Sequence, residues 1–158
     1  MHRYIKILAS LMVVIAASQS EQGLAQPELL SASTLQEPAA AVDAFHAALG
    51  RGDTSAAAAL LASDAVIYES GRAERSKDEY AGHHLPADMA FAKATERNIT
   101  RRTGQAVGDF AWVATETTTM GTFKSKHINS VGKETMLLRR SQGVWRIVHV
   151  HWSSADAK

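Results

Sequence analysis

Two histidines near the C-terminus, His149 and His151, are the residues whose type and spacing first suggest chemistry. They belong to "GVWRIVHVHWSS", residues 143–154, a segment rich in the β-branched and aromatic residues that favour strands. Because side chains alternate along a strand, His149 and His151 are predicted to share the inward face with the other odd-numbered residues. Neutral imidazoles on a pocket wall could exchange protons or bind a metal ion. The alternative is that both are hydrogen-bonded structural residues.

Glu134 is the predicted partner of this pair. If the turn "SQGV" closes with Ser141 opposite Val144, Glu134 lies beside His151 on one face of the sheet. A carboxylate there would orient the imidazole and raise its basicity. A three-residue turn with a glycine bulge would instead shift the pairing by one residue and send Glu134 to the opposite face.

A second group of candidates lies at the end of the first predicted strand, residues 64–70. Tyr68 and Glu69 point to opposite faces of that strand. Glu69, near a glycine at an expected pocket mouth, is a candidate general base, with an exposed strand-end carboxylate as the alternative. Tyr68 is a candidate ligand contact.

Further candidate ligand contacts lie in "YAGHHL" and on a later strand. Tyr80 precedes His83 by three positions and His84 by four, so the three side chains can share one helical face. Adjacent histidines before a proline could also face solvent. Trp112 is a further candidate contact, with a position in the core as the alternative.

Residues 1–25 have the features of a secretory signal peptide. A short basic start, "MHRYIK", precedes an apolar run and the small-residue sequence "GLA", which predicts cleavage after Ala25. The apolar run from Ile7 to Ala17 is shorter than the roughly 20 residues of a membrane-spanning helix. The sequence contains no cysteine, so disulfides, thiolate chemistry and cysteine-based zinc sites are excluded. We therefore expect a periplasmic or secreted protein without a membrane anchor after cleavage.

Charge and length limit the partners and the number of domains. The chain has 17 basic and 16 acidic residues, and loss of Arg3, Lys6 and Glu21 with the signal peptide leaves these charges balanced. A balanced chain offers no electrostatic surface for nucleic acid. Residues 26–36 lack periodicity and are expected to form a flexible leader. Residues 37–154 fit one domain, followed by a tail at 155–158.

The order of predicted elements indicates an α+β fold. Helices are expected at 37–49 and 54–61, after a capping box at 76–79, and from Pro86 onward. Four consecutive strands are expected after residue 95, in the segments 96–108, 109–123, 127–140 and 143–154. Helices followed by an antiparallel meander predict helices packed on one face of a curved sheet.

This order of elements, together with "AVDAFHAALGRGDTSAAAALLASDAVIYESG" and "GVWRIVHVHWSS", closely resembles the SnoaL-like/DUF4440 branch of the nuclear transport factor 2-like (NTF2-like) superfamily. The resemblance covers about residues 37–154. It implies a cone of helices against a strongly bent sheet that encloses a pocket, and usually a homodimer through the outer sheet face. The superfamily includes isomerases, cyclases, dehydratases, lyases and non-catalytic binders, so the fold alone selects no reaction.

Three functions remain open from the sequence. In the first, His149 and His151, helped by Glu69 or Glu134, exchange protons with a small hydrophobic ligand in an isomerase, dehydratase or lyase reaction that needs no cofactor. In the second, a periplasmic zinc or copper protein uses His84, His149, His151 and Glu69 as ligands. In the third, the domain is a non-catalytic dimeric scaffold.

Overall fold

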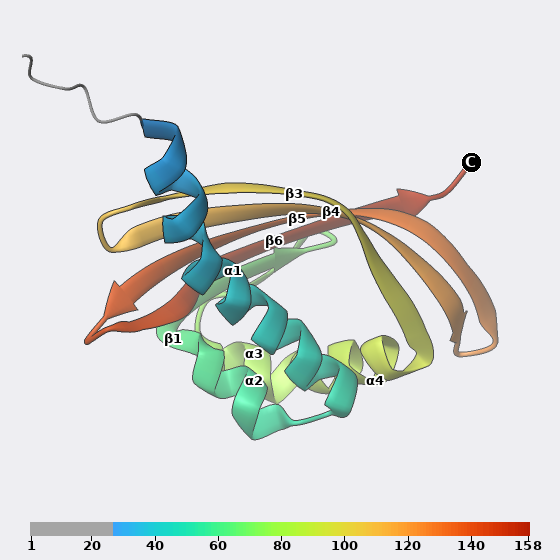
Figure 1. Cartoon of the computed structure of the whole chain (residues 1–158). Helices are drawn as coiled ribbons and strands as arrows, with labels where there is room; N and C mark the ends of the chain where they lie inside the picture. The colour runs from blue at the N-terminus through green and yellow to red at the C-terminus, as the bar shows by residue number, and fades with distance from the viewer. Residues whose placement is uncertain (1–26) are drawn as a thin grey trace, which may run out of the picture.

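The computed structural model describes the backbone of residues 27–158 and the side chains from residue 35 onward. The predicted signal peptide, residues 1–25, lies outside the described residues. In the described part of the chain, four helices cover one face of a six-stranded curved sheet, and no helix covers the other face (Figure 1). The helices are α1 (Pro27–Arg51), α2 (Thr54–Leu60), α3 (Lys77–His83) and α4 (Leu85–Ala94). The α+β class and the packing of the helices on a curved sheet are confirmed.

The sheet has the strand order β2-β1-β6-β5-β4-β3. Its strands are β1 (Leu61–Glu69), β2 (Arg72–Glu74), β3 (Thr95–Val107), β4 (Phe110–Phe123), β5 (Lys126–Ser141) and β6 (Val144–Asp156). The last four strands form the predicted antiparallel meander, whereas β1 pairs with β6 in parallel. The short β2 was not predicted, and β6 extends into the expected tail.

Helix α1 begins ten residues earlier than predicted. Residues 26–36 were expected to be a flexible leader, but the chain is helical from Pro27 onward. Leu35 packs against the hydrophobic core, and a Cβ atom at Gly104 of β3 would lie 2.9 Å from its side chain. The absence of a side chain at Gly104 therefore lets the helix approach the sheet closely. This tertiary contact, which is invisible in the local sequence, supports the early turns of the helix.

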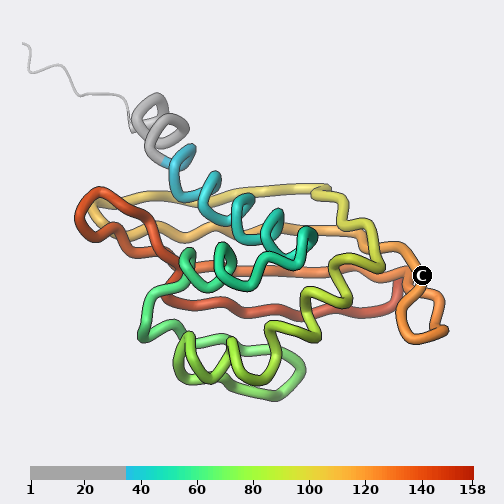
Figure 2. Tube along the Cα trace, turned by 90° about the horizontal axis from the view of Figure 1, so that it is seen from below, coloured from blue at the N-terminus to red at the C-terminus, as the bar shows by residue number. Residues whose placement is uncertain are grey.

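The hydrophobic core lies between the helices and the inner face of the sheet. Helix α1 crosses the sheet with α2 and α4 beside it (Figure 2). Val42, Phe45 and Leu49 recur at helical spacing and are all buried. The sheet meets them with alternate residues of its central strands, namely Val113, Met136, Leu138, Ile147 and Val150. No helix in the described part of the chain is long and apolar enough to cross a membrane.

A β-bulge interrupts the pairing of β5 with β6. The turn closes with Ser141 opposite Val144, as in the predicted register that placed Glu134 beside His151. Leu138 then pairs with Ile147, but its neighbour Leu137 pairs with His149, which leaves Val148 as an extra residue. Such a bulge reverses the inside-outside alternation of the strand from that point on.

The bulge overturns the prediction that the odd-numbered side chains of β6 point inward. Ile147 follows that prediction and is fully buried, but after the bulge Val150 and Trp152 face the helices. His149 and His151 lie on the outer face, where His151 is exposed. The strand was correctly predicted, and one inserted residue changed which face the histidines occupy.

Candidate functional site

A cavity of about 550 Å³ lies between the helices and the inner face of the sheet. This volume lies within the range of small-molecule sites in proteins. Apolar groups from α1 and α4, including Leu49, Phe91 and Ala92, form part of its lining. Its ionisable lining residues are His46, Glu69, Asp88, Arg97, Lys133 and Glu134. The cavity therefore combines an apolar wall with acid/base groups.

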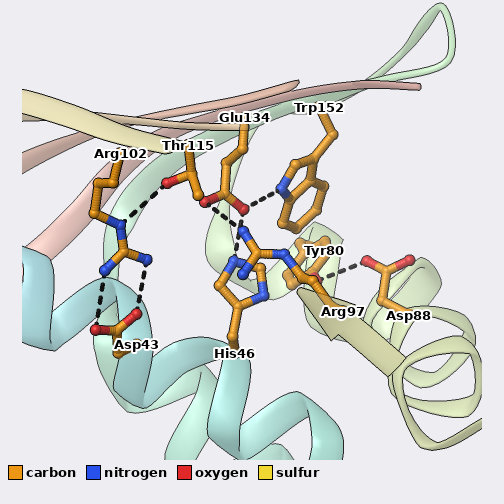
Figure 3. Close-up of polar contacts among 9 residues, drawn as sticks. All are labelled: Asp43, His46, Tyr80, Asp88, Arg97, Arg102, Thr115, Glu134 and Trp152. Atoms are coloured by element: carbon orange, nitrogen blue, oxygen red, sulfur yellow. Dashed lines mark hydrogen bonds and ion pairs between the residues drawn. The ribbon is translucent and has the colours of Figure 1, made fainter. Parts of the chain in front are cut away.

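A carboxylate and an imidazole form the central contact of this site. Nε2 of His46, on α1, lies 2.6 Å from Oε2 of Glu134, on β5. Glu134 points from the sheet toward the helices, and His46 points up to meet it (Figure 3). An ionised carboxylate only accepts hydrogen bonds, so the shared proton resides on Nε2 of His46. In the neutral ring, Nδ1 is then the basic atom.

Glu134 has two further donors and stays ionised despite its burial. Its side chain is 4% exposed. The indole Nε1 of Trp152 donates to Oε2 over 2.7 Å, and Arg97 donates to Oε1 over 3.3 Å. Burial by itself would raise the pKa of Glu134, but the hydrogen bond and charge of His46, the charge of Arg97 and the indole together hold that pKa below its ordinary value. The carboxylate is therefore a fixed negative charge beside Nε2 of the imidazole.

Aromatic contacts hold the imidazole in place. The ring of His46 meets Phe45 edge to face, with 5.8 Å between ring centroids. Phe45 in turn stacks on Trp152 at 6.3 Å. Both partners of the imidazole, the Glu134 carboxylate and the Phe45 ring, thus belong to one packed unit.

Two other carboxyl groups in the same cavity, Asp88 and Glu69, have raised pKa values, in contrast to Glu134. Burial raises the pKa of Asp88 on α4, and this outweighs the hydrogen bond of 2.7 Å that its Oδ2 accepts from the hydroxyl of Tyr80. Burial also raises the pKa of Glu69 at the end of β1, and the negative charge of Asp88 raises it further. Each group keeps its proton to a higher pH than an ordinary carboxylic acid.

Glu134 and Glu69, two of the four predicted catalytic residues, line the cavity. The predicted pairing of Glu134 with His151 is wrong, because the bulge places Glu134 opposite Trp152. His149 and His151 are absent from the cavity lining. Nδ1 of His149 instead lies 2.9 Å from the backbone oxygen of Val66, a structural contact.

The predicted ligand contacts Tyr68 and Trp112 lie on the outer face of the sheet. Tyr68 is 47% exposed and meets the ring of His149 edge to face at 5.2 Å. Trp112 is 38% exposed and pairs across the ladder with Leu137, which pairs with His149. These residues form an apolar row across the outer face and do not line the cavity.

The predicted cluster in "YAGHHL" does not stay together: Tyr80 lies in the core, whereas His83 and His84 contact Glu74 of β2. Tyr80 is fully buried and reaches the cavity only through its hydrogen bond to Asp88. His83 and His84 both turn their Nδ1 atoms toward Glu74 of β2. None of the three lines the cavity, so their predicted role as direct ligand contacts is not supported by their positions.

The four residues of the alternative metal site do not converge. His149 and His151 lie on the outer face, whereas Glu69 lines the cavity and His84 contacts Glu74. The described part of the chain has one group of three possible metal ligands whose ligating atoms all lie within 4.8 Å of one another, namely Glu74, Glu79 and His83. The predicted ligand set is therefore wrong for this geometry.

His46, Asp88 and Arg97 are the site residues that the sequence did not predict. A usable signal existed for His46, which follows Val42 by four positions and therefore shares its apolar helical face. A polar residue on a buried helical face is a candidate for a site. Asp88 and Arg97 carry no comparable local signal, since their placement depends on how α4 and β3 pack.

The fold and the cavity together define a cone-shaped α+β protein of the NTF2-like type. The model of the SnoaL-like domain matches residues 39–157, and the chain belongs to this family. No curated protein matches the chain.

Solved structures support this assignment. A protein from Shewanella frigidimarina, described as a "putative ketosteroid isomerase", is 38% identical with a TM-score of 0.72, over 74% of this chain and 94% of that one. A "putative dehydratase from the NTF2-like family" of Streptomyces avermitilis is 16% identical with a TM-score of 0.70, over 80% and 99% of the two chains. The association domain of CaMKII from C. elegans, also 16% identical, has a TM-score of 0.64 over 77% and 96%. The last two show the fold alone.

Proposed function

We propose that the cavity binds a small hydrophobic carbonyl compound and catalyses proton transfer on it, in a reaction of the isomerase or dehydratase type. The observation that carries this proposal is the pairing of His46 with the ionised Glu134 in the same cavity as Asp88 and Glu69, whose pKa values are raised. Environments that separate the pKa values of neighbouring groups are how enzymes assign a base and an acid.

His46 is the proposed base. Its Nδ1 removes a proton from the carbon beside the carbonyl group, and the electron pair of that C–H bond moves to form an enol or enolate. The imidazolium that results is stabilised by the carboxylate of Glu134 at Nε2. Returning the proton to a different carbon completes an isomerisation.

Asp88 or Glu69 is the proposed acid. A protonated carboxyl group can donate to the carbonyl oxygen as negative charge develops there. In a dehydration, the same proton would go to the departing hydroxyl, which leaves as water. Tyr80 fixes the orientation of Asp88 by its hydrogen bond.

The similar protein from Shewanella frigidimarina supports the choice of reaction class. It is described as a "putative ketosteroid isomerase", and it is 38% identical to this chain. Isomerisation of an unsaturated ketone needs a base, an acid and an apolar cavity. The groups around His46 and Asp88 supply those elements.

A solvent-exchange assay tests the proposal without knowledge of the natural substrate. A β,γ-unsaturated ketosteroid and a set of smaller cyclic enones are incubated with the protein in D₂O, and loss of the α-proton signals is followed by ¹H NMR. We expect exchange well above the buffer rate for at least one compound, with conversion to the conjugated ketone. Absence of protein-dependent exchange for every compound would overturn the catalytic proposal.

We further propose that the protein is exported and forms a homodimer. Export is supported by the basic, apolar and small-residue order of residues 1–25. Dimerisation is supported by the apolar row on the outer face, where Trp112 is 38%, Leu137 41% and Tyr68 47% exposed. Apolar groups gathered on one face of a sheet are typical of an interface.

A further inference from the structure

We infer that Glu74, Glu79 and His83 form a binding site for a divalent transition-metal ion, separate from the cavity. One oxygen or nitrogen atom from each residue lies within 4.8 Å of the other two. None of the three residues lines the cavity. Two carboxylates and one imidazole make a donor set suited to zinc, with water completing the coordination.

Helix α3 presents two of the ligands on one face. Glu79 and His83 are four residues apart, so their side chains are neighbours on the helix surface. The backbone of Glu79 donates to Oγ of Ser76 over 3.0 Å, and its Oε2 accepts from the backbone of Arg75 over 2.6 Å. This capping arrangement fixes the Glu79 side chain, and its second oxygen can serve a metal ion.

Glu74 supplies the third ligand from strand β2. Nδ1 of His83 lies 3.4 Å from Oε2 of Glu74. Two ligands about 2.1 Å from a tetrahedral zinc ion are themselves separated by roughly 3.4 Å, so this pair already has the required spacing. The side chain of Glu74 is 7% exposed and that of His83 is 67% exposed. The site thus has a buried anchor and an open side through which an ion can enter.

His84 supports the site as a positioning residue. Its Nδ1 contacts Oε1 of Glu74, the oxygen that is not in contact with His83. Hydrogen bonds to a ligating carboxylate orient it and affect metal affinity in many metal sites. The orientation of Glu74 is therefore fixed before an ion arrives.

Calorimetric titration of the untagged purified protein with ZnCl₂ tests the site. We expect one ion per chain, and affinity at least about tenfold weaker in His83→Gln and in Glu79→Gln. His83→Gln is the decisive variant, because this exposed side chain can be changed with little effect on folding. Asp78→Asn, on the same helix, and His127→Gln, an exposed histidine of β5, are matched controls that should bind zinc as the wild type does.

NMR of the histidine rings gives a second measurement. Sub-stoichiometric zinc should shift or broaden the His83 ring signals while those of His127 stay unchanged, and His46→Gln should keep full zinc affinity. No zinc binding up to millimolar concentration would overturn the inference. Equal affinity of His83→Gln and the wild type would overturn it as well.

Discussion

Nε2 of His46 lies 2.6 Å from Oε2 of Glu134, although 88 positions separate the two residues. The contact joins helix α1 to strand β5, and both residues line the cavity. The contact gives the buried Glu134 carboxylate one of its three donors, and it gives the His46 imidazole an acceptor that selects one tautomer. This pair is the basis of the first two predictions that follow.

Substitution of the proposed base should abolish most of the activity. We expect His46→Gln to reduce the α-proton exchange rate by a factor of about 100 or more, because general bases contribute 10² to 10⁴ in rate. The measurement is ¹H NMR exchange in D₂O, with circular dichroism to confirm the fold. His151→Gln is the matched control, since its side chain is exposed on the outer face, and it should change the rate less than about twofold. A greater loss in His151→Gln than in His46→Gln would reverse the assignment.

Glu134→Gln should destabilise the protein in a pH-dependent way. The pKa of Glu134 is lowered in the folded protein, so its ionised form contributes stability above the ordinary pKa of a glutamate. That contribution is lost as the pH falls through the lowered value. We expect a loss of about 1–3 kcal/mol in the free energy of unfolding at neutral pH. The difference should shrink in acid.

Urea unfolding of wild type and Glu134→Gln at neutral and acid pH measures this difference. Glu116→Gln is a useful control, because Glu116 forms an exposed ion pair with Lys133. An exposed pair contributes little to stability. If the two variants lost the same stability at neutral pH, the buried charge would not have the role assigned to it.

Asp88→Asn should trade activity for stability. Burial raises the pKa of Asp88, so the ionised form is disfavoured in the folded protein and stability falls as the pH rises through the raised value. The neutral amide removes this cost and can still accept the hydrogen bond from Tyr80. We expect the melting temperature at neutral pH to rise by about 2 to 4 °C, with little change in acid.

The same variant should be slow in the exchange assay, because an amide cannot donate the catalytic proton. Differential scanning fluorimetry at several pH values and the NMR exchange assay give the two readings. A variant that is both less stable and fully active would contradict the assignment of Asp88 as an acid held in a buried setting.

Substitution on the outer face of the sheet should separate the subunits of the proposed dimer. Trp112→Glu places a charge in the apolar row that also contains Leu137 and Tyr68, and desolvating that charge would oppose association. We expect sedimentation velocity to show a monomer for this variant and a dimer for the wild type. Ala59→Glu, on an exposed position of α2 over the opposite face, should leave the dimer intact.

The sequence predicted the order of elements well because periodicity and turn residues are local signals. Glu69 and Glu134, two of the predicted catalytic residues, line the cavity, and their catalytic role stays a prediction. The faces of His149 and His151 were not predictable, because a single extra residue, Val148, reverses the alternation and nothing in the local composition marks it. The partner of Glu134 is His46 of helix α1. The pairing of the strands does not show which helical residue packs against the sheet, so this contact could not be predicted.

The parallel pairing of β1 with β6 has a consequence for how the chain reaches its native state. Leu61 lies beside Ile147 and Glu69 beside Trp152, so β1 can pair with β6 only after residues 147–152 have been synthesised. Until then its hydrogen-bonding partner is the three-residue β2. Loop closure of this length is slow. We therefore expect the cavity wall that carries Glu69 to assemble late in folding, together with the pairing of β1 and β6.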